Sequence, residues 1–575
     1  MRFPPLTPRK RYRETIDAFG GYHHRDRIPE QDFYDLENLT SRNYPVLSTR
    51  KLRGLYAADA SPQGMIAKDS LCYVENGDFV MNGYRIPMEL SREPKQLVSM
   101  GAYVIILPDR KYISTVDPSD RGNIEAYFTA KSPVSAIPCQ LDGTEYVPDY
   151  VQPEEPTDPA NLALWVDTSA LPHSLKQYSG SLAMWTAVES TYVKLRCAGI
   201  GAAFSQYDGV TVSGLEDTAL EDLQGSAVLY GVEEDTVILA GLLERELTLE
   251  VPLTLSRKMP VMDFIIESNN RLWGCRYGLN DEGQVVNELY ACKQGDFRNW
   301  NCFLGISTDS YYVSLGSDGP FTGAITHGGY PLFFRETCLH KVYGQIPANF
   351  SVQTTACRGV RKGSEKSLAI VNEILYYHSI QGICAYDGAL PVEVSSALGD
   401  ISCSSAIGGA LGSRYYVSLE SQGKRSLFVY DTGRGLWHRE NDPGTRLLCA
   451  CREDMYCATE DGRIVTLLGS GEVWEETLTW MLETGILGGS LPEKKNLAQL
   501  SLRLCPEPGS RVDLYAQYDS RGSWEHLGHI TGQELHSVTV PVKPRRCDHL
   551  RLRLEGEGGC MLYSITKTYA VSGAR

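Results

Sequence analysis

The sequence lacks the patterns that identify many enzymes and membrane proteins. Its 575 residues contain no G-x-S-x-G nucleophile elbow, no H-E-x-x-H zinc motif and no phosphate-binding P-loop. The Gly-rich segment that begins at Gly199 lacks the third glycine of a dinucleotide-binding loop. The apolar run 102–108 has the length of a strand and falls far short of the roughly 20 residues that a bilayer helix needs. We therefore expect no membrane span and no cofactor.

Cysteine pairs and helical periodicity are also scarce. The chain has 16 cysteines but no C-x-x-C motif, and Cys449 and Cys451 flank one residue without further ligands at zinc-site spacing. No apolar segment follows the basic N-terminus, so we expect no secretory signal and synthesis in a reducing cytosol. Free thiols in strand cores follow from this reading. The best helical candidate, 215–223, is short.

What the sequence does contain is a recurring unit. Each copy has a small-residue stretch, an aromatic-rich strand, a polar turn and a strand that ends in Tyr-Asp-Gly or a similar phrase. Clear copies occupy 264–278, 368–388, 407–437 and 447–462. A small sheet repeated at a period of roughly 40 to 50 residues favours a β-propeller, and further units suggest about seven blades. The 33 tyrosines and 54 glycines suit aromatic strands joined by tight turns.

Two interruptions of the repeat predict the domain organisation. A Pro- and acid-rich connection starts at Asp149, and a different strand pattern follows it. Alternating strands return near the C-terminus and indicate a sandwich. The predicted all-β chain has an N-terminal arm (1–54), the first part of a propeller (55–148), a linker with an inserted β-rich domain (149–257), the remaining propeller (258–470) and a C-terminal β-sandwich (471–575).

Carboxylates at equivalent places of the repeat are the main candidates for catalysis, because propeller glycosidases use paired acids that no local motif reveals. These residues are Asp263, Glu267, Asp387 and Asp431. Asp387 and Asp431 lie in turn phrases, where a short acidic side chain caps the backbone, and we interpret them as structural. His23 and His24 are neighbours on an extended segment and point to opposite sides, which favours a polar loop over a metal site. We assign no catalytic residue.

Charge points to protein partners. The net charge of −16 disfavours a protein that binds nucleic acid nonspecifically over a broad surface. Basic residues nevertheless gather at the N-terminus and in one C-terminal loop, outside the repeat. These interface candidates are Arg9, Lys10, Arg11, Arg13, Lys543, Arg545 and Arg546.

One N-terminal segment resembles a known family. The segment 19–54 begins with glycines, continues through an aromatic and acidic stretch and Asn38, and ends in a P-x-L-x-T-R phrase at Pro45 to Arg50. This order is similar to the opening of phage virion propeller proteins, namely the tail hub or packaged-DNA stabilisation protein and the tail nozzle of short-tailed phages. The segment 268–300 also resembles phage and prophage tail proteins, and the resemblance implies that Asp296 and Trp300 close a turn.

The resemblance implies a non-enzymatic structural component of a virion tail or neck, made in the bacterial cytoplasm. Its copies are expected to form a homo-oligomeric ring around the DNA exit channel and to contact portal-side adaptor or tail-side proteins, while DNA passes without sequence-specific binding. The inserted domain and the sandwich depart from the hub proteins. Two alternatives stay open: a receptor- or glycan-binding tail protein, with Trp480 and Trp524 as candidate sugar contacts, or a propeller-type carbohydrate-active hydrolase.

Overall fold

The computed structural model describes residues 10–216, 218, 220–250, 252–280, 282–489, 494–532, 534–540, 542 and 546–571. Strands dominate, and the helical elements in these ranges are short 3-10 turns. Their bounds are η1 (Glu221–Leu223), η2 (Pro347–Asn349), η3 (Glu365–Ser367) and η4 (Ser396–Leu398). The predicted all-β class is confirmed, and the helical candidate 215–223 supplies only η1. None of the described helices is long and apolar enough to cross a membrane.

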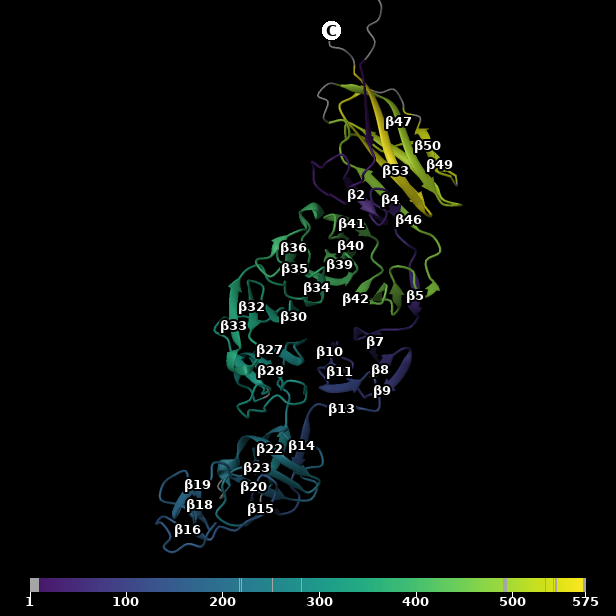
Figure 1. Cartoon of the computed structure of the whole chain (residues 1–575). Coiled ribbons are helices and arrows are strands. Elements are labelled where there is room, and N and C mark those ends of the chain that lie inside the picture. The colour runs from purple at the N-terminus through teal and green to yellow at the C-terminus, as the bar shows by residue number, and fades with distance from the viewer. Residues whose placement is uncertain are drawn as a thin grey trace, which may run out of the picture.

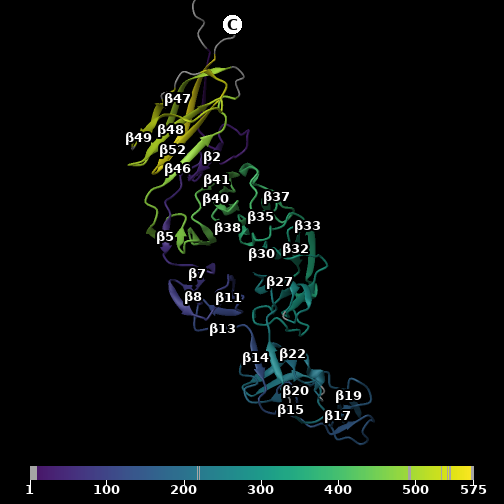
Figure 2. The same ribbon diagram turned by 180° about the vertical axis from the view of Figure 1, so that it is seen from behind.

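Three bodies follow one another along the molecule (Figure 1). Small sheets form the middle body. A body with long strands lies at one end and holds strands from both termini of the described chain, while the inserted unit 126–257 lies at the other end. The view from behind shows the same order (Figure 2). The molecule is therefore elongated, with its two non-repeat bodies at opposite ends.

Within the described residues, the middle body has seven antiparallel sheets of four main strands each. Their bounds, sheet by sheet, are β6 (Gly64–Lys68), β7 (Ser70–Glu75), β8 (Asp78–Met81) and β9 (Tyr84–Pro87); β10 (Gln96–Met100), β11 (Tyr103–Leu107), β12 (Lys111–Ser114) and β13 (Arg121–Asn123); β26 (Phe264–Ser268), β27 (Arg271–Leu279), β28 (Val285–Ala291) and β29 (Tyr311–Ser314); β30 (Gly323–His327), β31 (Tyr330–Phe334), β32 (Cys338–Tyr343) and β33 (Ser351–Ala356); β34 (Ala369–Val371), β35 (Ile374–Ser379), β36 (Gly382–Tyr386) and β37 (Val392–Glu393); β38 (Ser405–Leu411), β39 (Arg414–Ser421), β40 (Lys424–Asp431) and β41 (Leu436–Glu440); and β42 (Thr445–Cys451), β43 (Asp454–Thr459), β44 (Ile464–Thr466) and β5 (Gly54–Ala57), with β45 (Glu472–Val473) added to β5.

The sheets form a closed ring. The contacts run from β6 to β10, β26 and β30, through η3 to β38, and then through β42 back to β6. A small residue allows β38 to approach η3 closely: a Cβ added at Gly408 would lie 2.7 Å from the carbonyl oxygen of Ser367. The second strands carry aromatic side chains that are fully buried between neighbouring sheets, among them Phe333 and Tyr377.

The seventh sheet is completed by the N-terminal part of the chain. Strand β5 pairs antiparallel with β44 although more than 400 residues separate them in sequence. The sequence placed the start of the first repeat at Leu55, and the structure corrects this because β5 belongs to the last sheet. The pairing of β5 with the last sheet satisfies a strand edge that would otherwise be open. The ring therefore closes only when residues far apart in sequence meet.

The inserted unit has an eight-stranded sheet, in the order β14-β25-β21-β22-β23-β20-β15-β24, and a four-stranded sheet, β16-β17-β18-β19. The bounds are β14 (Ala126–Thr129), β15 (Val134–Cys139), β16 (Tyr150–Gln152), β17 (Leu164–Asp167), β18 (Ser174–Ser179), β19 (Met184–Ala187), β20 (Tyr192–Arg196), β21 (Gly209–Ser213), β22 (Gly225–Glu233), β23 (Thr236–Ala240), β24 (Leu247–Leu249) and β25 (Thr254–Arg257). Entry strand β14 pairs with exit strand β25, so the unit begins before the expected boundary at residue 149. Part of the expected linker forms β16.

The remaining body consists of two sheets that pack face to face, and we call it the sandwich. Its first sheet contains β1 (Lys10–Ile16), β3 (Leu39–Thr40), β4 (Leu47–Thr49), β47 (Lys495–Pro506), β50 (His536–Val540), β51 (Arg546–Cys547) and β53 (Cys560–Val571). Its second sheet contains β2 (Phe33–Glu37), β46 (Thr479–Thr484), β48 (Arg511–Tyr518), β49 (Glu525–Thr531) and β52 (Leu550–Glu557). Leucines of both sheets, such as Leu502 and Leu554, share one core. The N-terminal segment thus supplies strands to the sandwich instead of forming a separate arm.

We expect Gly54→Ala to weaken ring closure. A Cβ at Gly54 would overlap the backbone oxygen of Ser470, which cannot move aside as a flexible side chain can. Overpacking of this kind costs about 1–3 kcal/mol, so the midpoint of thermal unfolding should fall. Gly316→Ala is the matched control, because its Cβ would meet open space. Equal midpoints for the two variants would contradict the role of Gly54 in closure.

Candidate functional site

The sequence-derived interface candidates fall into two groups. Arg9, Lys543 and Arg545 lie outside the described residues. Lys10 belongs to β1, and Arg11 and Arg13 are exposed on that strand. Among the described strands, β1 pairs with β53 alone, at the edge of the first sandwich sheet. Arg546 is exposed on β51.

Strand register brings two of these candidates together. Arg11 pairs with Ala570, Ala570 pairs with Asn496, and Asn496 pairs with Arg546. Residues directly opposite each other in antiparallel strands point to the same face, and neighbouring strands are about 4.8 Å apart, so the two arginines lie on one row about 14 Å apart. Arg11 of the N-terminal strand and Arg546 of β51 therefore belong to one surface of the first sandwich sheet.

The segment that resembles phage proteins forms the joint between sandwich and ring. Its Asn38 has a φ of 59° and is buried. The side-chain Nδ2 of Asn38 donates to the carbonyl oxygen of Thr479 at 2.8 Å, in the sandwich. Its Oδ1 accepts from Asn441 N at 3.0 Å, next to β41, and from Arg50 Nε at 2.9 Å. One side chain therefore links the ring, the sandwich and the N-terminal segment.

Arg50 is the centre of this joint. Only 5% exposed, it donates from Nη1 and Nη2 to the two carboxylate oxygens of Glu475, both at 2.7 Å. Nη2 also donates to the side chain of Asn441 at 2.8 Å, and Nη1 to the carbonyl oxygen of Lys51. Such a bidentate pair fits the planar fork of arginine and cannot be reproduced by lysine. The buried charge is thus neutralised and fully hydrogen-bonded.

A second arginine shares the acidic partners of Arg50. The backbone N of Arg53 donates to Glu475 at 3.1 Å, and its guanidinium lies 3.5 Å from Glu440. Burial, and then the charge of Arg50, lower the pKa of Arg53. Burial alone would raise the pKa of Glu475, but its hydrogen bonds and the nearby arginine charges together bring it below the ordinary 4.5. The carboxylate remains ionised at neutral pH as the counter-charge of the joint.

Asp431 has a different role from the one expected for a turn aspartate. Its fully buried carboxylate accepts from Ser41 Oγ at 2.7 Å and from Arg414 at 3.2 Å. The sequence interpretation as a local backbone cap is wrong for this side chain, because its partners include the N-terminal segment 390 residues away. Asp387 does cap its turn, through the backbone N of Ala389 at 3.0 Å.

The other residues considered for chemistry are engaged locally. Asp263 pairs with Arg276 at 2.6 Å, and Glu267 accepts from the backbone of Asn270. Trp480 is buried and donates to the carbonyl oxygen of Gly558, whereas the ring of Trp524 stacks on a guanidinium. No group of three His, Cys, Asp or Glu side chains suited to a metal occurs in the described ranges.

A polar network fixes the inserted unit to the ring. Asn299 donates from Nδ2 to Asp208 at 3.0 Å and to Asp296 at 2.6 Å, and its Oδ1 accepts from the backbone N of Gly209. Asp208 is buried and forms an ion pair with Arg257. Arg257 also donates from Nε to the carbonyl oxygen of Ile124, directly after β13 of the second sheet. The turn implied at Asp296 is present. The insertion therefore docks directly on the sheet β26–β29.

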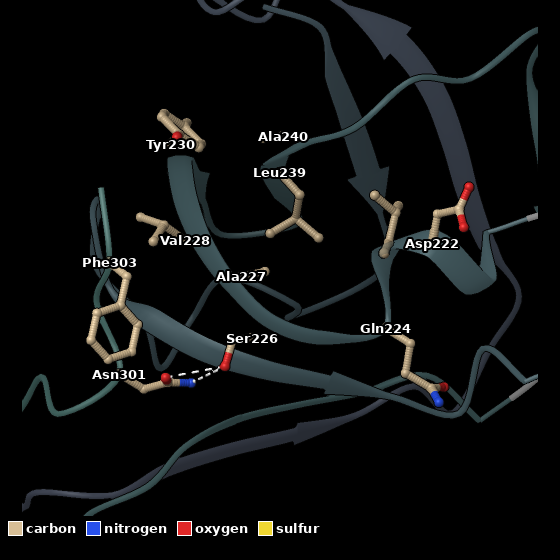
Figure 3. A pocket seen from close by; sticks show the side chains of 11 residues that line it. Asp222, Gln224, Ser226, Ala227, Val228, Tyr230, Leu239, Ala240, Asn301 and Phe303 are labelled. Carbon is tan, nitrogen blue, oxygen red and sulfur yellow. Dashed lines mark hydrogen bonds between the residues drawn. The ribbon is translucent and has the colours of Figure 1, made fainter. Parts of the chain in front are cut away.

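A pocket of about 220 Å³ lies beside this docking contact (Figure 3). Strand β22 forms one wall, and Asn301 and Phe303 of the ring form another. The side chains of Ser226 and Asn301 hydrogen-bond across the junction at 2.8 Å. The sequence did not single out these residues; the only signal was the aromatic phrase 297–303, far from the insertion strands it contacts.

Comparisons with known proteins identify no family. No protein-family model and no curated protein matches the chain. Among solved structures, an exo-β-1,3-galactanase from Phanerochaete chrysosporium with galactose matches at 9% identity and a TM-score of 0.15, covering 77% of this chain and 100% of that one. The galactanase with β-1,3-galactotriose gives the same values. A glycoside hydrolase matches at 11% identity and 0.15, covering 65% of this chain and 94% of that one.

These matches correct one prediction. The sequence indicated a protein without enzymatic activity, whereas the structures reported above are all glycoside hydrolases, so that prediction is contradicted and is not retained. At a TM-score of 0.15 the matches assign neither fold nor activity to this chain. The function therefore has to be argued from the chain's own geometry.

We expect Arg50→Ala to destabilise the protein by about 3–5 kcal/mol, because it breaks an ion pair whose arginine is buried and leaves the half-buried Glu475 without its bidentate partner. Urea unfolding measures the loss. Arg50→Lys should recover only part of it, since lysine restores the charge without the fork. Arg511→Ala is the control: its pair with Asp513 lies at the surface, and the change should stay within about 1 kcal/mol. Similar losses for the Arg50→Ala and control variants would refute the central role of Arg50.

Proposed function

We propose that this chain is a structural component of a bacteriophage tail or neck, a hub- or nozzle-like protein whose copies form a ring around the DNA exit channel. The observation that carries the proposal is the role of segment 19–54. The residues that resemble phage virion proteins, Asn38 and Arg50 among them, are the ones that lock ring and sandwich together. A segment with this mechanical role suits a protein that transmits load between neighbours.

The architecture supports the same proposal. We infer that the closed ring is a seven-bladed β-propeller in which each four-stranded sheet is a blade. The inserted unit and the sandwich lie at opposite ends (Figure 1), so each is free to contact a different neighbour. One end would bind the portal-side adaptor and the other a tail-side protein. The net charge of −16 suits a channel wall that repels DNA phosphates and lets DNA slide.

Imaging of intact phage particles tests this function. We expect density for this chain in the tail or neck, as a closed ring with a channel wide enough for duplex DNA. Mass measurement of the purified protein under assembly conditions should show the same oligomer. Absence of the chain from purified particles would refute the proposal.

A second candidate is carbohydrate binding, with or without hydrolysis. One open pocket of about 450 Å³ in the second sandwich sheet favours it, because carboxylates line the pocket. Strand register places Glu37, Glu555 and Asp513 on one row. Carboxylates accept hydrogen bonds from sugar hydroxyls, and pairs of them act as acid and base in glycoside hydrolysis. Trp480, considered as a sugar contact from sequence, is largely buried and lines this pocket.

The carbohydrate candidate predicts that the purified chain binds β-1,3-galactotriose, the sugar bound by the similar galactanase, or releases reducing sugar from it. Glu555→Gln should abolish the effect, because it removes a charge from the row. Asp400→Asn is a suitable control, since this carboxylate is exposed and lies on the ring. If the unmodified protein neither binds the sugar nor releases reducing sugar from it, this candidate is eliminated for that class of glycan.

A further inference from the structure

Another pocket is lined by residues of both the inserted unit and the ring. It has a volume of about 410 Å³ and shares Asn301 and Phe303 with the pocket of Figure 3. Its walls come from the exit of the inserted unit, from the hairpin β27–β28 and from the segment that leads into β29. The pocket therefore exists only because the insertion docks on the ring.

Four aromatic side chains contribute to its walls. Trp300 is 6% exposed, and its Nε1 donates to the carbonyl oxygen of Phe297 at 2.9 Å, so its indole N–H is already satisfied. Phe303 and Tyr312 are 44% and 60% exposed, and their rings meet edge to face with centroids 6.0 Å apart. Tyr290 completes the aromatic lining. Large aromatic side chains left open beside a pocket indicate a binding site.

A carboxylate lines the same pocket. Glu288 accepts from the hydroxyl of Tyr290 at 2.6 Å and from Ser314 Oγ at 3.2 Å. Both donors are neutral hydroxyls. Burial, and then the hydrogen bond to Glu288, raise the pKa of Tyr290, so its phenol keeps its proton and continues to donate. No ion pair of Glu288 with a described lysine, arginine or histidine accompanies these bonds, and its negative charge is left for a ligand.

The lining favours one class of ligand. The charged lining residues Glu282, Glu288 and Lys258 give the pocket one net negative charge, which disfavours anions. A small ammonium ion is strongly hydrated and would gain little from aromatic walls. An ammonium with methyl groups matches both features, because aromatic faces attract its charge and its methyl groups leave water readily. We propose that this pocket binds ligands that carry a quaternary or methylated ammonium group, with Glu288 as counter-charge.

Choline is the probe for the proposal, and 3,3-dimethylbutan-1-ol is its uncharged counterpart of the same shape. Calorimetric titration of the full chain at constant ionic strength should show binding of choline and at least about tenfold weaker binding of the alcohol, since the cation–π contribution depends on charge. Equal affinities for the two compounds would overturn the proposal. So would the absence of choline binding when millimolar choline is present in 100-fold excess over the protein. So would a preference for neutral sugars, which would make the pocket a glycan site.

Two variants locate the binding. Glu288→Gln keeps the shape and removes the charge, and Tyr312→Ala removes an exposed wall; each should weaken choline binding by at least about tenfold. Tyr84→Ala is the matched control, because this tyrosine is 77% exposed on a distant sheet. If the control variant loses choline binding, or if both pocket variants keep it unchanged, the ligand binds elsewhere. The outcome is independent of any location in a virion.

Discussion

The structure depends on how it accommodates the buried charge of Arg50. A guanidinium cannot lose its proton in a protein, so burying it demands a matched acceptor for each donor. Here the acceptors come from segments far apart in sequence: Asn38 beside it, Asn441 at the end of the sixth sheet and Glu475 after the seventh. They come together only when ring, sandwich and N-terminal segment are all in place. The network therefore favours one relative placement of these bodies.

Ring closure and the joint between ring and sandwich depend on the same N-terminal segment. Strand β5 follows Arg50 and Arg53 within a few residues, so fixing the arginines also positions the strand that completes the seventh sheet. The same segment supplies β2, β3 and β4 to the sandwich. Since hydrophobic side chains of the segment, such as Phe33 and Leu36, join a core that reaches both bodies, the polar network specifies geometry while apolar burial stabilises it.

Sequence patterns were informative where structure is local. Short strands with turn residues between them predicted the all-β class, and the turn of Asp387 follows from a side chain that reaches two residues along the chain. Pairings across long separations were missed. The partner of Asp431, the entry strand β14 and the common row of Arg11 and Arg546 all depend on register between distant strands, which periodicity does not encode. The sequence identified the basic residues as interface candidates, but it did not show that Arg11 and Arg546 lie on one row.

The aromatic pocket shows the same limit for functional sites. Its walls combine residues of the insertion with Glu288, Trp300 and Tyr312, so no single stretch of sequence contains the pattern. The buried hydrogen bonds of Asn299 with Asp208 and Gly209 fix the relative position of these walls, because each joins the inserted unit to the ring. An insertion that hung from its two connections alone would give such a pocket no fixed shape. Rigid docking thus has a second consequence beyond elongating the molecule: it creates a concave surface that neither body possesses alone.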